Sequence, residues 1–274
     1  MTIEVHQDSR STPDPRAADA WEPAPGPASA DPSVCGGEAP LDVLSQHLAR
    51  QAAELGGALG VLPELVADDP AQWSRAAELA HEPYEGLLAL VNETADRWNA
   101  PPHVAAALLW KTYGYWHTLP MALGWALNRR VPLMGFADTL VRPSAEGLTI
   151  AAAKVTVAVL PDDPLAGAPG TVVVCDLAAA IRDALIDGQR PVIRALGALA
   201  RIGERTLWGS TAEALARPIL SLRSYDEAAA LLDRIGPPVA GLLTPDGDGY
   251  RRRTCCLWVA LPDTDPCVTC CVRR

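Results

Sequence analysis

Five of the seven cysteines in this 274-residue chain lie within its last twenty residues, and their spacing restricts what that end of the chain can form. The segment reads TCCLWVALPDTDPCVTCC, and its cysteines are Cys255, Cys256, Cys267, Cys270 and Cys271. The first four follow the pattern C-C-x10-C-x2-C, and Cys271 is left over. A C-x2-C pair folds into a tight turn that directs both sulfurs at one metal ion. The spacing therefore predicts a metal-binding loop.

The adjacent pair, Cys255 and Cys256, favours a two-iron cluster over a single ion. Consecutive side chains of a strand point to opposite faces, so these two thiols meet at one centre only through a turn or a kinked backbone. A [2Fe-2S] cluster offers a broader target, because each iron takes two thiolates. We expect Cys255 and Cys256 on one iron and Cys267 and Cys270 on the other. The spacing favours Cys270 as the fourth ligand, while Cys271 either substitutes for it or is a free thiol.

Three alternatives to an iron–sulfur cluster stay open for the cysteine segment. Zinc also accepts four thiolates, but its usual sites use two C-x2-4-C pairs, which an adjacent pair fits poorly. Disulfides are the second alternative, and they are rare in a reducing compartment. Chance clustering is the third, and the density of cysteines over so few positions argues against it.

The bulk charge and the N-terminus exclude several classes of protein. A net charge of -10 and a pI of about 4.9 argue against binding to nucleic acid or to an anionic membrane surface. The first residues, MTIEVHQDSR, lack the basic and apolar regions of a signal peptide. The longest apolar stretch, residues 104–127, contains Lys111, His117 and Pro120, so we expect no integral membrane segment. These features predict a cytoplasmic location, where clustered thiols stay reduced.

Arginines bracket the cysteine segment and predict a basic patch on an acidic body. They are Arg251, Arg252, Arg253, Arg273 and Arg274. Beside an iron–sulfur cluster, cations raise the reduction potential, because the cluster becomes more negative on reduction. Asp263 and Asp265 have the opposite effect if they are close, and we expect them instead in a solvent-facing turn.

The remaining sequence predicts a mostly helical α+β domain with a small central antiparallel sheet. Apolar periodicity predicts helices near 41–55, 71–81, 83–98, 102–129, 176–188, 190–202, 206–217 and 224–235. Strands are expected near 133–141, 148–160 and 171–175, with the residues SAEG suited to a hairpin turn between the first two. Pro120 should kink or break the helix that contains it. Cys175, at the end of the third strand, is expected to be buried and unreactive.

These elements predict three parts of the chain. Residues 1–40 are rich in Pro, Ala, Asp and Ser and are expected to be a disordered tail, which contains the isolated Cys35. Residues 41–250 form the helical α+β body. Residues 251–274 form the C-terminal segment that binds the cluster.

The segment RRRTCCLWVALPDTDPCVTCC resembles the C-terminal signature of the ferric-siderophore reductase family, of the FhuF type. The spacing C-C-x10-C-x2-C, the preceding arginines and the Leu-Trp after the paired cysteines carry the resemblance. Weaker similarity lies in ALLWKTYGYW around Lys111 and in LWGSTAEAL at 207–215. The resemblance as a whole extends over residues 60–274, but only the last twenty residues are specific. The additional Cys271 departs from the family pattern.

The resemblance implies an oxidoreductase that transfers one electron from a [2Fe-2S] cluster to siderophore-bound Fe(III). The ligands would be Cys255, Cys256, Cys267 and Cys270, with no catalytic residue beyond the cluster. The substrate would be a ferric siderophore, most often of hydroxamate type, docked on the body at residues that the sequence does not identify. The chain has no nucleotide-binding motif, so electrons would come from an external donor such as a ferredoxin-like protein or a flavoprotein reductase.

Other functions are compatible with the same cysteines. The chain could be an iron–sulfur or zinc sensor of redox state or iron, or an electron carrier whose acceptor is a protein. A siderophore-assembly ligase would need a nucleotide site, which we do not find. Among the eight tryptophans, core packing is the favoured role for the helical ones, although a flat chelate site would use the same side chains. The tryptophans concerned are Trp110, Trp116, Trp125, Trp208 and Trp258, the last within the cluster loop, where it would shield the cluster from water.

Overall fold

The computed structural model describes residues 39–57, 59–144 and 147–272. The predicted disordered tail at 1–40 lies outside the described residues except for its last two. Cys35, Arg273 and Arg274 also lie outside them.

Helices make up about half of the described chain and, with three small sheets, confirm the predicted α+β class. They are α1 (Asp42–Glu54), α2 (Ala76–Leu79), α3 (Glu85–Trp98), α4 (Pro102–Asn128), α5 (Leu177–Gly188), α6 (Arg190–Ala200), α7 (Glu204–Leu220) and α8 (Tyr225–Ile235). The predicted bounds agree to within three residues except at 71–81. That range holds a short 3-10 helix, η2 (Pro70–Gln72), then strand β2 (Ser74–Arg75) and then α2. The helix is interrupted because Ser74 and Arg75 pair with a neighbouring strand.

The prediction of one central antiparallel sheet is not accurate, because the strands form three small sheets. The first has the order β1-β5-β4-β2 and the second the order β3-β6-β7, and each contains one parallel pair. The third is the antiparallel hairpin β8–β9. The strands are β1 (Val61–Val66), β3 (Val131–Leu133), β4 (Thr139–Ser144), β5 (Gly147–Ala152), β6 (Thr156–Val159), β7 (Thr171–Val173), β8 (Leu243–Asp246) and β9 (Gly249–Arg252).

Two predicted strands each divide between two sheets. The range 133–141 covers the end of β3 and the start of β4, and the range 148–160 covers β5 and β6. The predicted hairpin joins β4 to β5, although its two turn residues, 145 and 146, lie outside the described residues. Strand β1 was not predicted, because Pro63 removes a backbone donor, and it is found at a sheet edge where that loss is tolerated.

Cys175 is exposed, so the prediction that it is buried was wrong. It follows β7, which is an edge strand of its sheet. Val172 and Val173 in that strand are also exposed. The apolar run TVVV is therefore not evidence of a core position at this edge.

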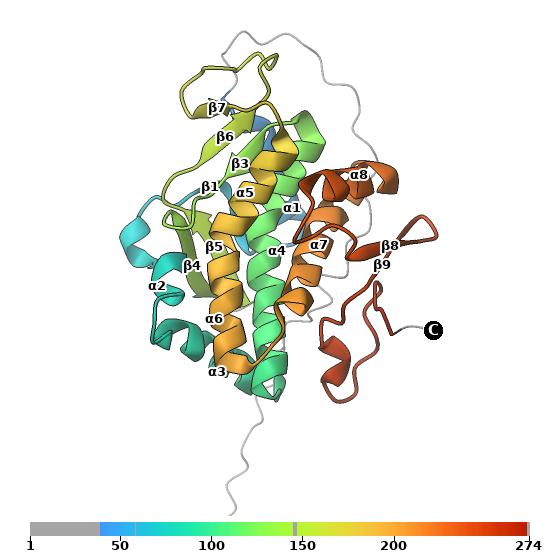
Figure 1. Ribbon diagram of the computed structural model, residues 1–274. Coiled ribbons are helices and arrows are strands. Elements are labelled where there is room, and N and C mark those ends of the chain that lie inside the picture. Colours follow the sequence, from blue (N-terminus) through green and yellow to red (C-terminus); the bar gives the residue numbers. More distant parts are fainter. Residues whose placement is uncertain (1–38, 58, 145–146, 273–274) are drawn as a thin grey trace, which may run out of the picture.

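Helix α4 runs through the centre of the molecule, with α5, α6 and α7 beside it (Figure 1). Nineteen of its 27 residues are buried, which is typical of a helix packed on all sides. The helix begins at Pro102, as predicted, because proline suits the first turn. It continues through Pro120, so the predicted break is wrong. The neighbouring helices and strands that enclose α4 keep this segment helical despite the lost hydrogen bond.

A buried polar network joins α4 to α7 through Gln189, which lies between α5 and α6. The Gln189 amide donates to Thr118 Oγ1 at 2.8 Å and lies 3.1 Å from Nδ1 of His117. Thr211 of α7 donates from its hydroxyl to the side-chain oxygen of Gln189, Oε1, at 2.8 Å. Thr139 Oγ1 lies 3.5 Å from Nε2 of His117. Since the Gln189 amide needs an acceptor at Nδ1, the network suits neutral His117 with its proton on Nε2. Burial accordingly lowers the pKa of His117 to about 4.

We expect this histidine to make the fold acid-sensitive. The unfolded chain binds the proton below pH 6.5, while folded His117 resists it until about pH 4, so stability falls as the pH falls through that window. Between pH 7 and pH 5 the loss from this one group is about 2 kcal/mol. Urea denaturation at both pH values should show a smaller pH effect for His117→Gln, by about that amount. His103→Gln, at an exposed position of the same helix, is the control, and equal pH effects in all three proteins would contradict the prediction.

Among the described residues, no helix combines the length and the apolar character needed to cross a bilayer.

Candidate metal centre

The cysteine segment leaves strand β9 and packs against one end of the central helix. It continues through a 3-10 turn, η3 (Trp258–Ala260), and returns to Cys267. Figure 1 shows it below the β8–β9 hairpin, on the side of the molecule that α7 borders. The predicted boundary between body and cluster segment at 250–251 falls inside β9, and the division into domains stays a prediction.

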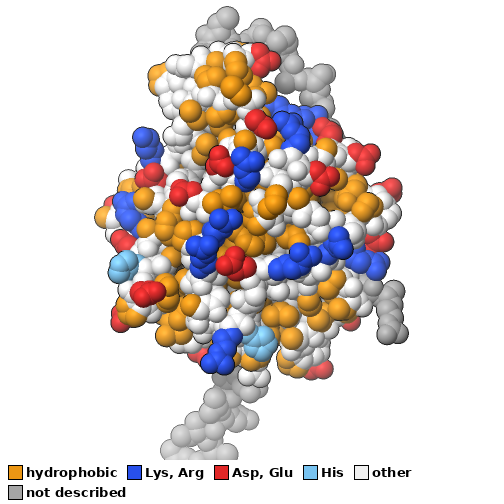
Figure 2. Space-filling view, viewed as in Figure 1, with side chains coloured by type: hydrophobic (Ala, Val, Ile, Leu, Met, Phe, Trp, Pro, Cys, Tyr) orange, Lys and Arg blue, Asp and Glu red, His pale blue; other side chains and the backbone are white. Residues whose placement is uncertain are grey.

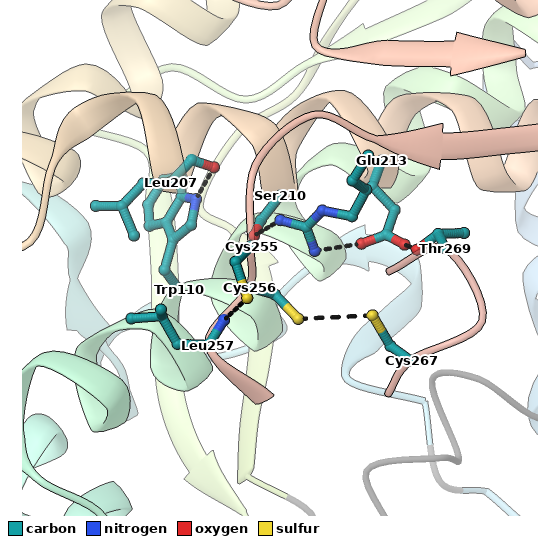
Figure 3. A network of polar contacts seen from close by, with 10 residues as sticks. Trp110, Leu207, Ser210, Glu213, Cys255, Cys256, Leu257, Cys267 and Thr269 are labelled. Atoms are coloured by element: carbon teal, nitrogen blue, oxygen red, sulfur yellow. Dashed lines mark hydrogen bonds and ion pairs between the residues drawn. The ribbon is translucent and has the colours of Figure 1, made fainter. Parts of the chain in front are cut away.

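Three of the four predicted ligands lie together in a buried apolar cluster. They are Cys256, Cys267 and Cys270, and none forms a disulfide. The Sγ atoms of Cys256 and Cys267 are 3.8 Å apart, and Figure 3 shows these two side chains pointing toward each other. The cluster is completed by Val104, Leu108, Trp258 and Leu261. Buried free thiols in one place are what a soft metal centre needs.

Cys270 follows Cys267 through the tight turn that the C-x2-C spacing predicts. Its backbone N–H donates to the carbonyl oxygen of Cys267 at 3.0 Å, three residues back along the chain. In the same turn the carbonyl oxygen of Thr269 accepts from the backbone N–H of Arg252 at 2.9 Å. The turn is thus attached to the end of β9, just before the first cysteine pair.

Cys255 and Cys271 lie outside the buried cluster, and both are half-buried. Burial raises the pKa of Cys271, and so does the nearby thiol of Cys255. The Cys255 sulfur also accepts the backbone N–H of Leu257 at 3.3 Å. Leu257 has a φ of 64°, a left-handed conformation that is unusual for leucine. The backbone therefore turns directly after the adjacent pair, which is the kind of distortion that such a pair requires.

No complete metal site is formed in the described part of the chain, although three of the thiols lie in one buried cluster. No three side chains of His, Cys, Asp or Glu there are placed so that they could hold one metal ion. The four-cysteine ligand set and the assignment of two cysteines to each iron therefore stay predictions. The sulfurs of Cys256 and Cys267 have a suitable separation, because two thiolates on one tetrahedral metal at about 2.3 Å lie roughly 3.8 Å apart. The donor set fits a thiolate-bound centre, with convergence of the remaining sulfurs coupled to binding.

A buried ion pair lies directly behind these thiols. Arg252 donates from Nη1 to Glu213 Oε2 at 2.8 Å and from Nη2 to Ser210 Oγ at 2.9 Å. Thr269 Oγ1 donates to the other Glu213 oxygen. Figure 3 shows Ser210 and Glu213 reaching from α7 toward the cysteine segment. Only 1% of the Arg252 side chain is exposed, so this pair is screened very little by solvent.

The charges around the thiol pair favour a thiolate. The hydrogen bond from Cys267, together with the charges of Arg252 and Lys111, lowers the pKa of Cys256 to about 6 against the effect of burial. The same hydrogen bond raises the pKa of Cys267, so the pair loses one proton readily and holds the second. Burial raises the pKa of Glu213, but Arg252 and Lys111 outweigh it and the net shift is downward.

Strand alternation separates the three arginines that the sequence grouped together. Arg252 is on the inner face of β9 and reaches the site. Arg251 pairs with Asp246 across the hairpin at 2.9 Å, and exposed Arg253 donates to the carbonyl oxygen of Gly241 at 3.4 Å. Figure 2 shows Lys and Arg side chains in an interrupted row among apolar and acidic ones, rather than in one patch on that face.

The aromatic predictions are largely confirmed. Trp258 packs edge-on against Trp98, with ring centroids 5.4 Å apart, inside the cysteine cluster. Trp116 is half-buried, and Asp263 and Asp265 are exposed, as expected for a solvent-facing turn. Core packing holds for Trp110, Trp125 and Trp208.

Sequence reasoning missed the site residues that come from the body of the protein. Lys111, Ser210 and Glu213 lie far from the cysteines in sequence, although both segments that contain them were noted for weaker similarity. Glu213 carried one local signal, an acidic residue among buried apolar positions of a helix. No local pattern shows which distant group will pair with it.

Comparison with known proteins adds no assignment. No model of a known protein family matches the chain, and no curated protein matches it. The resemblance to ferric-siderophore reductases therefore rests on the cysteine segment and its flanking residues.

Proposed function

We propose that this protein is a ferric-siderophore reductase that uses a [2Fe-2S] cluster held by its C-terminal cysteines. The observation that carries the proposal is the arrangement of Cys256, Cys267 and Cys270. These free thiols come from both halves of C-C-x10-C-x2-C and lie in one buried cluster, with two sulfurs 3.8 Å apart. Cys255 is the fourth proposed ligand, and its sulfur already accepts the backbone N–H of Leu257.

Reduction releases iron because a siderophore binds the two oxidation states of iron with different strength. Hard oxygen donors of a hydroxamate siderophore hold Fe(III) strongly and Fe(II) far more weakly. The cluster, when bound, would supply the single electron that converts one state to the other. An external ferredoxin-like protein or flavoprotein reductase would replace that electron.

The residues around the site suit a centre near the surface. Trp258, Leu261 and Val104 shield the inner thiols from water. The outer edge of the same segment is open, since Val268 is 66% and Val272 is 56% exposed. A chelate or a donor protein at this edge would approach the sulfurs without entering the core.

Anaerobic purification tests the cofactor. We expect a coloured protein with about two iron and two sulfide ions per chain, whose visible absorption bleaches with dithionite. A colourless protein that retains one zinc ion per chain would overturn the proposal. The reduced protein, mixed with a ferric hydroxamate and an Fe(II) trap, should then yield trapped Fe(II). A cluster that reduces no ferric siderophore would favour a sensor or an electron carrier.

Serine substitutions test the ligand set. Since Cys270 lies with the buried thiols and Cys271 does not, Cys270→Ser should lose most of the bound iron, while Cys271→Ser should retain it. Cys256→Ser and Cys267→Ser should behave like Cys270→Ser. Cys175→Ser, at an exposed thiol far from the segment, is the control. Iron loss in Cys271→Ser together with retention in Cys270→Ser would show that the fourth ligand is wrongly assigned.

A further inference from the structure

Arg252 carries a buried hydrogen-bond donor that nothing in the described structure satisfies. Two of its guanidinium nitrogens are occupied, Nη1 by Glu213 and Nη2 by Ser210. The third, Nε, is buried and has no hydrogen-bond partner among the described residues. Leaving a charged donor unpaired in the interior costs about 1–3 kcal/mol or more, so a protein keeps such a group only for a structural or functional reason.

The attachments of Arg252 connect it to both cysteine pairs. It precedes Cys255 by three residues, and its backbone N–H is bonded to Thr269, which lies inside the C-x2-C turn. Its positive charge acts on the sulfurs of both Cys256 and Cys267. The ion pair with Glu213 prevents the guanidinium from moving toward solvent, because both side chains are almost completely buried.

We propose that Arg252 is a positioning residue that holds its positive charge beside the sulfurs of the cluster and so raises the reduction potential. This inference rests on the proposed function, since it requires the cluster. A [2Fe-2S] centre with four thiolates becomes more negative on reduction, and N–H donors and cations beside its sulfurs stabilise the reduced form. Glu213 and Ser210 orient the guanidinium.

Arginine is needed because one side chain must hold two partners while it keeps its charge in place. Its planar fork presents separate donors to Glu213 and to Ser210. Lysine has a single point charge on a flexible stem, so Arg252→Lys keeps the charge but not its fixed position. Arg252→Met alone would leave Glu213 as a buried unpaired charge, which endangers folding. The double variant Arg252→Met/Glu213→Gln removes both charges and avoids that problem.

Redox potentiometry with electron paramagnetic resonance detection tests the inference without any activity assay. Compared with Glu213→Gln, the double variant should show about a tenfold lower ratio of reduced to oxidised cluster at a fixed potential. That ratio corresponds to a downward shift of about 59 mV for a one-electron couple. Arg252→Lys should shift in the same direction by less, relative to the unmodified protein. Arg253→Gln, which removes a charge from the neighbouring exposed residue, is the control.

The outcomes separate this inference from the proposed function. A cluster whose potential is the same in Glu213→Gln and in the double variant would overturn the role of Arg252 and leave the cofactor assignment standing. An unshifted potential in Arg252→Lys would show that the charge acts without being positioned by Glu213 and Ser210. A protein that reduces no ferric siderophore still allows the potential to be measured. A wild-type protein without any iron–sulfur cluster would refute both proposals.

Discussion

Replacing Gly209 with alanine is expected to detach the cysteine segment from α7. A Cβ atom at Gly209 would lie 1.8 Å from Thr254 Oγ1 and 3.0 Å from Thr254 Cβ, and Thr254 directly precedes the cysteine pair. Overpacking of this kind costs about 1–3 kcal/mol, and a contact this short belongs at the upper end. Alanine also improves the helix by about 1 kcal/mol. We therefore expect a net loss of about 2 kcal/mol in urea denaturation, with loss of most of the proposed cluster.

Two further variants make the Gly209→Ala prediction specific. Gly203→Ala changes the N-cap of the same helix, where a new Cβ meets nothing within 4 Å, so it should retain stability and iron. Thr254→Ala removes the closest atom of the clash, and Thr254 Oγ1 is itself buried without a hydrogen-bond partner in the described structure. The double variant Gly209→Ala/Thr254→Ala should therefore recover part of the loss. No recovery would show that the contact with Thr254 is not the cause.

Trp110→Ala should be the most destabilising substitution in the core. Trp110 is completely buried on α4, and its Nε1 donates to the carbonyl oxygen of Leu207 on α7 at 2.9 Å. Removing a buried tryptophan costs about 3–5 kcal/mol, through lost transfer energy and the cavity that remains. The site already borders a small apolar cavity that Tyr113 also lines, so the new space should enlarge it rather than collapse. Urea denaturation at neutral pH measures the loss.

Trp110→Phe is the matched control for this prediction. It keeps most of the apolar volume but removes the donor to Leu207, a hydrogen bond worth about 1 kcal/mol. We expect it to lose less than half as much stability as Trp110→Ala. If the two variants lose the same amount, the hydrogen bond between the helices matters and the packing volume does not. A loss below about 1 kcal/mol in Trp110→Ala would contradict the buried position itself.

Local patterns predicted most of the helices but assigned the strands less well. Apolar periodicity of 3.6 residues depends only on near neighbours, which is why the bounds of α3, α4 and α5 are close to those expected. Strands need partners from elsewhere in the chain. The run at 148–160 therefore looked continuous, although it divides between two sheets at Ala153–Val155. Pro120 misled for a related reason, because enclosure by other elements overrides a local helix breaker.

The candidate site divides in the same way between local and distant information. The C-x2-C turn at Cys267 and Cys270 was predictable, since it needs one hydrogen bond across three residues. The contact between Cys256 and Cys267 was not predictable, because it joins two separate motifs. The expected pairing within each motif follows sequence order, whereas these two sulfurs, 3.8 Å apart, come from opposite ends of the loop.

The sequence by itself determined the helical α+β class and the C-C-x10-C-x2-C segment as the candidate metal centre. Both follow from residue types at short, regular spacings. Only the tertiary structure decided that Arg252, rather than its two neighbours, lies behind the thiols, and that Ser210 and Glu213 hold it there. These contacts join residues about forty positions apart, and they exist because Gly209 lets the segment approach α7 closely. Such a close approach depends on how two distant segments pack, and no local pattern encodes that geometry.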